Sequence, residues 1–256
     1  MIAEEMTEID GAPIGYARYG TGPNNFLFIP GGVGCYAKDY PPAVPMAFDS
    51  AKVTIIMIDP PGYGKSRPPD RKQAVNRCQL DAQVCIKLMQ KLGLTPFTVV
   101  GWSEGGRTAV HVANQGRDAV KKMVMFGAST RCDARGARVF QSMRNTDLWL
   151  AETKAVYLEH YDEDYFRKQW ADLCDLVVQV YDDLGGRFLS DHCLKRIRQP
   201  VLVLNGGMDR FCSDPKYFLE NFPDARLIVH AQANHDLHIK YPQWFAEHVQ
   251  DFAIDD

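Results

Sequence analysis

Short, continuously apolar runs recur along the chain between more polar segments. They occupy residues 26–29, 53–58, 97–100, 123–126, 201–204 and 227–229. Runs this short and this apolar are typical of strands buried on both faces of a parallel sheet. Before them, residues 9–19 hold Asp10, Gly11 and Gly15 between short apolar runs, which predicts an antiparallel hairpin at the start of the fold.

Helical periodicity fills several of the intervals between these runs. The clearest case is residues 76–92, where an apolar residue recurs at every fourth position from Leu80 to Leu92, before Gly93. Weaker helical patterns cover residues 108–114, 215–221 and 243–252. Alternating strands and helices require crossover connections, so the chain is predicted to form a mostly parallel, doubly wound α/β sheet.

Residues 129–188 interrupt the alternation. This segment has no buried-strand run, but it has helical periodicities and many aromatic residues. The aromatic residues include Trp149, Tyr157, Tyr161, Tyr165, Phe166, Trp170, Tyr181 and Phe188. We predict a helical cap at 129–188, inserted into a core formed by 1–128 and 189–256.

Composition and charge narrow the function classes. A chain of 256 residues with 46% hydrophobic and 24% charged residues fits one large globular domain. The formal net charge of -3 gives no general attraction to nucleic acid or to an anionic membrane. The basic stretch containing Arg131, Arg135, Arg138 and Arg144 is partly at helical spacing, and we interpret it as a solvated helix face.

The first ten residues and the cysteines indicate a cellular compartment. The N-terminal stretch carries three glutamates and an aspartate, unlike a secretory signal, and no apolar run is long enough to span a membrane. Seven scattered cysteines without C-x-x-C spacing favour reduced thiols and no metal site. We therefore expect a cytoplasmic location. The oligomeric state is left open.

The motif with the most specific chemistry is Gly-Trp-Ser-Glu-Gly at residues 101–105, which matches G-x-S-x-G. The pattern is weak alone, but here it follows a predicted strand and precedes a segment that can be helical from Gly106 onward. That is the strand–turn–helix setting of a nucleophile elbow, in which glycines allow strand and helix to approach closely at a strained turn. It predicts the α/β-hydrolase fold, with Ser103 as nucleophile.

A serine nucleophile needs a base and an orienting acid, which follow it in this fold in the order acid, then histidine. Asp209 comes directly after one late predicted strand, and His235 lies in the loop after the next. The predicted triad is therefore Ser103, Asp209 and His235. The alternatives are Asp214 for the acid and His238 for the base. We interpret His238, one helical turn beyond His235, as a packing or capping residue.

The tetrahedral intermediate of acyl transfer also needs backbone donors. Residues 30–34, Pro-Gly-Gly-Val-Gly, form a loop after an early predicted strand. We predict that the N–H groups of Gly32 and Glu104 form the oxyanion hole, with Val33 as the alternative to Gly32.

This chemistry needs no metal or organic cofactor. Residues 62–66 end like a phosphate-binding loop, but Asp59 stands where the first glycine is required. Residues 32–34 would need a further glycine where Ala37 stands for a dinucleotide fingerprint. The expected partner is a small-molecule ester, with no nucleic acid and no membrane.

Three segments resemble one family in particular. The elbow, residues 59–71 and residues 234–238 are similar to those of the valacyclovir hydrolase, or biphenyl hydrolase-like, family. The similarity runs from about Phe26 to the C-terminus and includes residues 161–166 of the predicted cap. The resemblance implies hydrolysis of α-amino acid esters by a serine triad.

Two departures from that family concern the site. The family has aspartate after the nucleophile, where it holds the α-ammonium group of the substrate, and here Glu104 stands at that position. The family has a bulky methionine in the oxyanion loop, and here the residue is Gly32. The resemblance thus implies that the Glu104 side chain binds the substrate. The alternatives are a general carboxylesterase, a carbon–carbon bond hydrolase, or a non-catalytic ligand-binding member of the fold.

Overall fold

A mixed eight-stranded sheet forms the centre of the computed structural model, which describes residues 1–212 and 214–254. Its strands are β1 (Ile2–Ile9), β2 (Ala12–Tyr19), β3 (Asn24–Ile29), β4 (Val53–Ile58), β5 (Phe97–Trp102), β6 (Val120–Phe126), β7 (Val201–Gly206) and β8 (Ala225–His230). Their order is β1-β2-β4-β3-β5-β6-β7-β8. β2 pairs antiparallel with β1 and β4, and every later pair is parallel.

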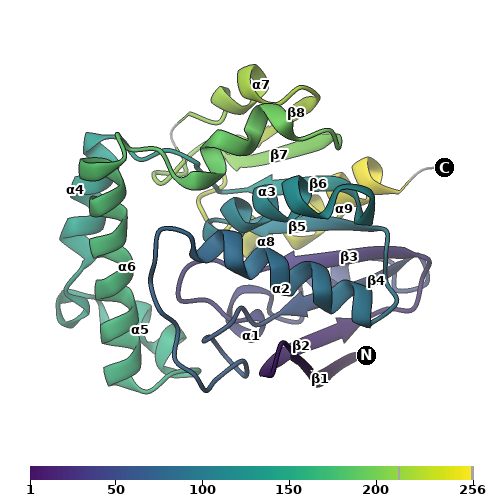
Figure 1. Cartoon of the computed structure of the whole chain (residues 1–256), viewed down its shortest axis with the longest axis horizontal. Coiled ribbons are helices and arrows are strands. Elements are labelled where there is room, and N and C mark those ends of the chain that lie inside the picture. Colours follow the sequence, from purple (N-terminus) through teal and green to yellow (C-terminus); the bar gives the residue numbers. More distant parts are fainter. Residues whose placement is uncertain (213, 255–256) are drawn as a thin grey trace.

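Helices cover both faces of the sheet (Figure 1). The α-helices of the described residues, including those that do not cover the sheet, are α1 (Tyr36–Asp39), α2 (Arg77–Lys91), α3 (Glu104–Gly116), α4 (Ala134–Met143), α5 (Ala151–Leu158), α6 (Glu163–Asp183), α7 (Tyr217–Asn221), α8 (Leu237–Lys240) and α9 (Pro242–Ala253). One face packs against α2 and α3 through residues such as Leu88 and Val110. The other packs against α9 through Phe245 and Val249. No helix in the described part of the chain combines the length and apolarity that crossing a membrane requires.

The predicted elements are present, with one error of burial. All six apolar runs form strands, and β1 and β2 form the hairpin, with positive φ at Asp10 (52°) and Gly11 (79°) as a two-residue turn requires. The prediction of a buried strand at 227–229 is wrong, because β8 is the edge strand and Val229 is 46% exposed. A short apolar run indicates a strand but not its place in the sheet.

The helices α4, α5 and α6 all lie between β6 and β7 in the sequence, and Figure 1 shows them beside the sheet rather than over its faces. Trp149 packs edge-on against Phe166 and Trp170. The same apolar cluster includes Val33 and Tyr63, which belong to the loops after β3 and β4. The aromatic side chains of this segment therefore fasten it to loops at the carboxyl ends of the strands.

Candidate active site

Ser103 lies in the sharp turn between β5 and α3. Its backbone angles are φ 54° and ψ -116°, a region that residues other than glycine rarely adopt. A Cβ atom added to Gly105 would lie 2.2 Å from the carbonyl oxygen of Ile29, and one added to Gly101 would lie 2.2 Å from that of Gly105. Both flanking glycines are thus required by the close approach of helix and strand.

The structure brings the predicted acid and base to this turn. His235 Nε2 lies 3.1 Å from Ser103 Oγ, and His235 Nδ1 lies 2.9 Å from Asp209 Oδ2. The other carboxylate oxygen of Asp209 accepts hydrogen bonds from the N–H groups of Phe211 and Cys212, at 2.8 and 3.3 Å. Because β5, β7 and β8 are parallel, the residues that follow them meet at one edge of the sheet.

The environment of Asp209 keeps its carboxylate ionised. Burial alone would raise its pKa, but the hydrogen bond and charge of His235 and the two backbone N–H donors outweigh burial, so the pKa is lowered. The His235 ring is held by its neighbours as well, since Trp102 Nε1 donates to the His235 carbonyl at 2.9 Å and Phe211 packs against the ring. These contacts fix the orientation of the imidazole between acid and serine.

The rival candidates lie in different surroundings. His238 is completely buried, and its Nε2 lies 2.7 Å from the carbonyl oxygen of Asp39. Burial lowers the pKa of His238 to about 3, so this ring is neutral. Asp214, the alternative acid, is exposed, whereas Asp209 is buried. The geometry favours Asp209 and His235 over both rivals.

This difference leads to a prediction about the two histidines. Replacing His238 by alanine would empty a packed site and should lower the free energy of unfolding by about 2–4 kcal/mol, measured by urea denaturation. Replacing the partly exposed His235 should change stability far less but should abolish ester hydrolysis. If His238→Ala were as inactive as His235→Ala while remaining folded, the base would have to be reassigned.

The loop after β3 lies against Ser103. A Cβ atom at Gly31 would be 3.4 Å from Ser103 Cβ. Among the described residues, the N–H groups of Gly32 and Glu104 donate to no protein acceptor, and neither does that of Val33, so the two alternatives for the loop donor both stay open. A Cβ atom at Gly32 would lie 2.7 Å from Leu173 Cδ2 of α6. Any larger residue at this position would therefore require the Leu173 side chain to shift.

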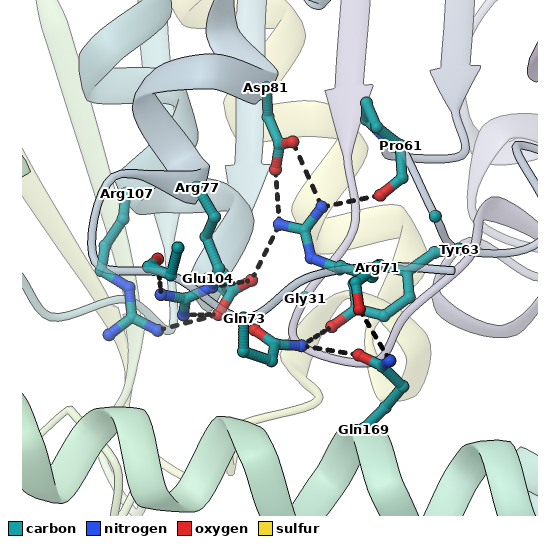
Figure 2. A network of polar contacts seen from close by, with 12 residues as sticks. Gly31, Pro61, Tyr63, Arg71, Gln73, Arg77, Asp81, Glu104, Arg107 and Gln169 are labelled. Atoms are coloured by element: carbon teal, nitrogen blue, oxygen red, sulfur yellow. Dashed lines mark hydrogen bonds and ion pairs between the residues drawn. The ribbon is translucent and has the colours of Figure 1, made fainter. Parts of the chain in front are cut away.

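The side chain of Glu104 points into a cluster of arginines (Figure 2). Arg77 binds both of its carboxylate oxygens, through Nε at 3.1 Å and through Nη2. Arg71 and Arg107 each approach to 3.5 Å. Burial alone would raise the pKa of Glu104, but the three guanidinium charges outweigh burial and lower the pKa to about 2. The carboxylate is therefore ionised and already paired.

This arrangement departs from the prediction that the Glu104 side chain binds a substrate ammonium. Its partners are cations, and a further cation beside Arg71, Arg77 and Arg107 would be repelled by all three. The sequence did not indicate these partners, because Arg71 and Arg77 lie 33 and 27 residues before the glutamate, on another element. Only Arg107, three residues after Glu104 on the same helix, stood at a spacing from which the sequence could have indicated a partner.

Ser103 opens onto a cavity of about 450 Å³, the volume of a small-molecule site. Its walls come from the segment after β6, from α4 and α6, and from the loop after β7. Arg131 and Arg135 line it, so the interpretation of the basic stretch as a solvated helix face is incomplete. Arg138 is exposed and does not line the cavity, and Arg144 pairs with exposed Asp175 at 2.6 Å.

No group of three or more His, Cys, Asp or Glu residues in the described part of the chain is arranged to hold a metal ion. The seven cysteines are buried and none forms a disulfide with another described residue.

Comparison with known proteins identifies the fold family of this chain. The family model described as alpha/beta hydrolase fold matches residues 24–155, more than half of the chain. The chain belongs to the α/β-hydrolase fold family. Among the relatives of this α/β hydrolase is "Serine hydrolase BPHL" of Mus musculus, which is 29% identical over 255 residues, or 98% of this chain and 86% of that protein. The predicted fold is thus confirmed.

Other similar proteins carry different descriptions. A 2-hydroxy-6-oxononadienedioate/2-hydroxy-6-oxononatrienedioate hydrolase of Pseudomonas sp. is 28% identical over 228 residues, covering 80% of this chain and 76% of that protein. The solved structure of 2-hydroxy-6-oxo-6-phenylhexa-2,4-dienoate hydrolase from Rhodococcus sp. has a TM-score of 0.79 at 15% identity, covering 98% of both chains. At 15% identity, the likeness to the Rhodococcus structure shows the fold alone.

Proposed function

We propose that this protein is a serine hydrolase of carboxylic esters, with Ser103 as nucleophile, His235 as base and Asp209 as orienting acid. The observation that carries the proposal is the position of the His235 ring, 3.1 Å from Ser103 Oγ on one side and 2.9 Å from Asp209 Oδ2 on the other. This is the arrangement in which an imidazole can accept the serine proton while a carboxylate stabilises the charge that the ring acquires.

The proposed reaction proceeds in two displacements. Ser103 Oγ attacks the ester carbonyl as its proton passes to His235 Nε2, and the N–H groups of Glu104 and of Gly32 or Val33 stabilise the oxyanion. Collapse of this intermediate expels the alcohol, which takes the proton from His235, and leaves an acyl-enzyme. Water then attacks the acyl group with His235 again as base, and the acid product leaves.

In this proposal residues 129–188 are a cap over the nucleophile, inserted into a core of 1–128 and 189–256. Support comes from α4 and α6, which supply walls of the cavity that contains Ser103. Further support comes from Gln169 of α6, whose Nε2 donates to the carbonyl oxygen of Arg71 at 2.9 Å and so ties the cap to the core (Figure 2).

The substrate range in this proposal is general carboxylic esters rather than α-amino acid esters. The amino ester alternative comes from the resemblance of the sequence to the valacyclovir hydrolase family and needs the Glu104 carboxylate to be available. The ion pairs that Glu104 forms with Arg71, Arg77 and Arg107 argue against that availability.

Carbon–carbon bond hydrolysis is the second candidate. It is favoured by the likeness to the oxononadienedioate hydrolase of Pseudomonas sp.. Both candidates need the same Ser103 and His235, so variants of the triad cannot separate them, whereas a comparison of rates on an ester and on a substrate with a carbon–carbon bond to be hydrolysed can.

A fluorophosphonate probe tests the nucleophile directly. Wild-type protein should be modified stoichiometrically at Ser103, as measured by intact mass and peptide mapping, because an activated serine is required for reaction with the phosphorus. Ser129 lines the same cavity, but its Oγ donates to the carbonyl oxygen of Arg131. Ser129→Ala is therefore the matched control and should still be labelled, whereas Ser103→Ala should not. Labelling that persists in Ser103→Ala would refute the assignment.

A further inference from the structure

Arg107 is a buried cation that lacks a full set of partners. It is only 9% exposed, it lines the cavity that contains Ser103, and its guanidinium lies 3.9 Å over the ring of Phe188. Its one hydrogen bond to a described residue runs from Nη2 to Glu104 at 3.5 Å, and its buried Nε has no acceptor. An arginine can donate five hydrogen bonds, so most of this donor capacity is unused by the described residues.

The buried cluster around Arg107 has more positive than negative charge. Arg71, Arg77 and Arg107 face only two carboxylates, those of Glu104 and Asp81, and Asp81 is engaged by Arg71 at 2.6 Å. Arg77 is the main partner of Glu104. The excess positive charge therefore lies on Arg107, the arginine of this cluster that lines the cavity.

The pKa shifts of Arg77 and Arg107 agree with this distribution of charge. Burial acts against the charge of both, but contact with Glu104 raises the pKa of Arg77 above its ordinary value, whereas the pKa of Arg107 remains lowered. The cavity-lining guanidinium is thus the one whose charge the protein compensates least.

The exposed wall of the cavity adds to the positive charge. Arg131, Arg135 and Arg210 line it, and none of them forms an ion pair within the described residues. The carboxylates on this wall are Asp133, which is occupied as the N-cap of α4, and Asp214. With Arg107 included, four guanidinium groups face two carboxylates around the space next to the nucleophile.

We propose that this cavity selects esters that carry a second, ionised carboxylate, and that Arg107 binds this group. The planar guanidinium donates two parallel N–H groups that match a carboxylate, and a water-poor setting strengthens the pairing. Arg131, Arg135 and Arg210, which are exposed, attract the same charge toward the cavity. The inference rests on the proposed function, because it assigns the substrate class of the Ser103 site.

Three p-nitrophenyl esters with the same six-carbon acyl chain test the inference: the hexanoate, the monoadipate and the norleucine ester. They present no charge, a distal carboxylate and an α-ammonium group, respectively. Wild-type protein should have the highest kcat/KM for the monoadipate. The ratio of kcat/KM for monoadipate to that for hexanoate should fall roughly tenfold to a hundredfold in Arg107→Gln, the range for a hydrogen bond between charged groups.

Arg135 and Arg138 supply a matched pair on α4, because only Arg135 lines the cavity. Arg135→Gln should lower the monoadipate preference at low salt and lose this effect at high salt, whereas Arg138→Gln should leave the preference unchanged. In Arg107→Lys part of the preference should return. A ratio unaffected by Arg107→Gln would overturn the inference, as would a wild-type preference for the hexanoate or the norleucine ester.

Failure of the inference is distinguishable from failure of the proposed function. If the hexanoate is hydrolysed with dependence on Ser103 but the monoadipate is not preferred, the site is an esterase without the anionic selectivity. If no ester is hydrolysed and Ser103 is not labelled, the proposed function itself is wrong, and the inference falls with it.

Discussion

Replacing Ser103 by alanine is expected to lower kcat for p-nitrophenyl hexanoate by about 10⁴–10⁶-fold. The oxyanion donors belong to the backbone and survive the substitution, but His235 then has no oxygen from which to take a proton. The rate that remains reflects binding and the oxyanion hole alone. Steady-state kinetics, with circular dichroism to verify the fold, measure the effect.

The companion variants make this prediction specific. His235→Ala should lose activity to a similar degree, and the double variant Ser103→Ala with His235→Ala should be little worse than either, because triad members act as a unit. Ser129→Ala, in the same cavity, should keep the wild-type rate within a few fold. A folded Ser103→Ala protein with more than about a tenth of wild-type activity would contradict the triad.

Replacing Glu104 by glutamine is expected to destabilise the fold by about 3–5 kcal/mol at neutral pH, because three buried guanidinium groups would lose their shared anion. Urea denaturation monitored by tryptophan fluorescence gives the free energy of unfolding. The matched control is Glu163→Gln, since Glu163 is half exposed in its pair with Lys154 and should contribute well under 1 kcal/mol.

The dependence on pH follows from the lowered pKa of Glu104. Folding shifts this pKa from 4.5 to about 2, so the stabilisation is fully present above about pH 4.5 and is lost as the pH falls toward 2. The stability difference between the wild type and Glu104→Gln should therefore shrink across this interval. In the kinetic panel, Glu104→Gln should not selectively lower the rate for the norleucine ester. A selective loss for that substrate would support the amino ester alternative.

Local patterns were sufficient to predict most of the fold. Buried strands need apolar residues on both faces, so β3 to β7 were visible as continuous runs, and the Asp10–Gly11 turn marked the hairpin. The edge position of β8 was not visible, because strand order is decided by packing between segments far apart in the sequence. Helices α4 to α6 were predicted only as a helical segment, since their aromatic residues follow no single period.

In the candidate site, too, features set by neighbouring residues were predictable, and contacts between elements far apart in the sequence were not. The elbow could be read from residues 97–106, because the motif stands between a predicted strand and a predicted helix, and the close approach of these segments requires its glycines. The pairing of Glu104 with Arg77, and the arrival of Arg107 and Arg135 at one cavity, depend on how α2, α3 and α4 are packed. A single sequence carries no record of those distances, so the charged lining became visible only in the folded chain.

Ser103 and His235 are separated by 132 residues along the chain, so the ribosome completes them at different times. The nucleophile and its elbow leave the ribosome long before β7 and β8, which deliver the acid and the base. A nascent chain can therefore expose the serine turn while it still lacks Asp209 and His235. In the proposed mechanism hydrolysis begins only after the last strands have joined the sheet, so the appearance of esterase activity in a translation reaction would time the completion of the fold.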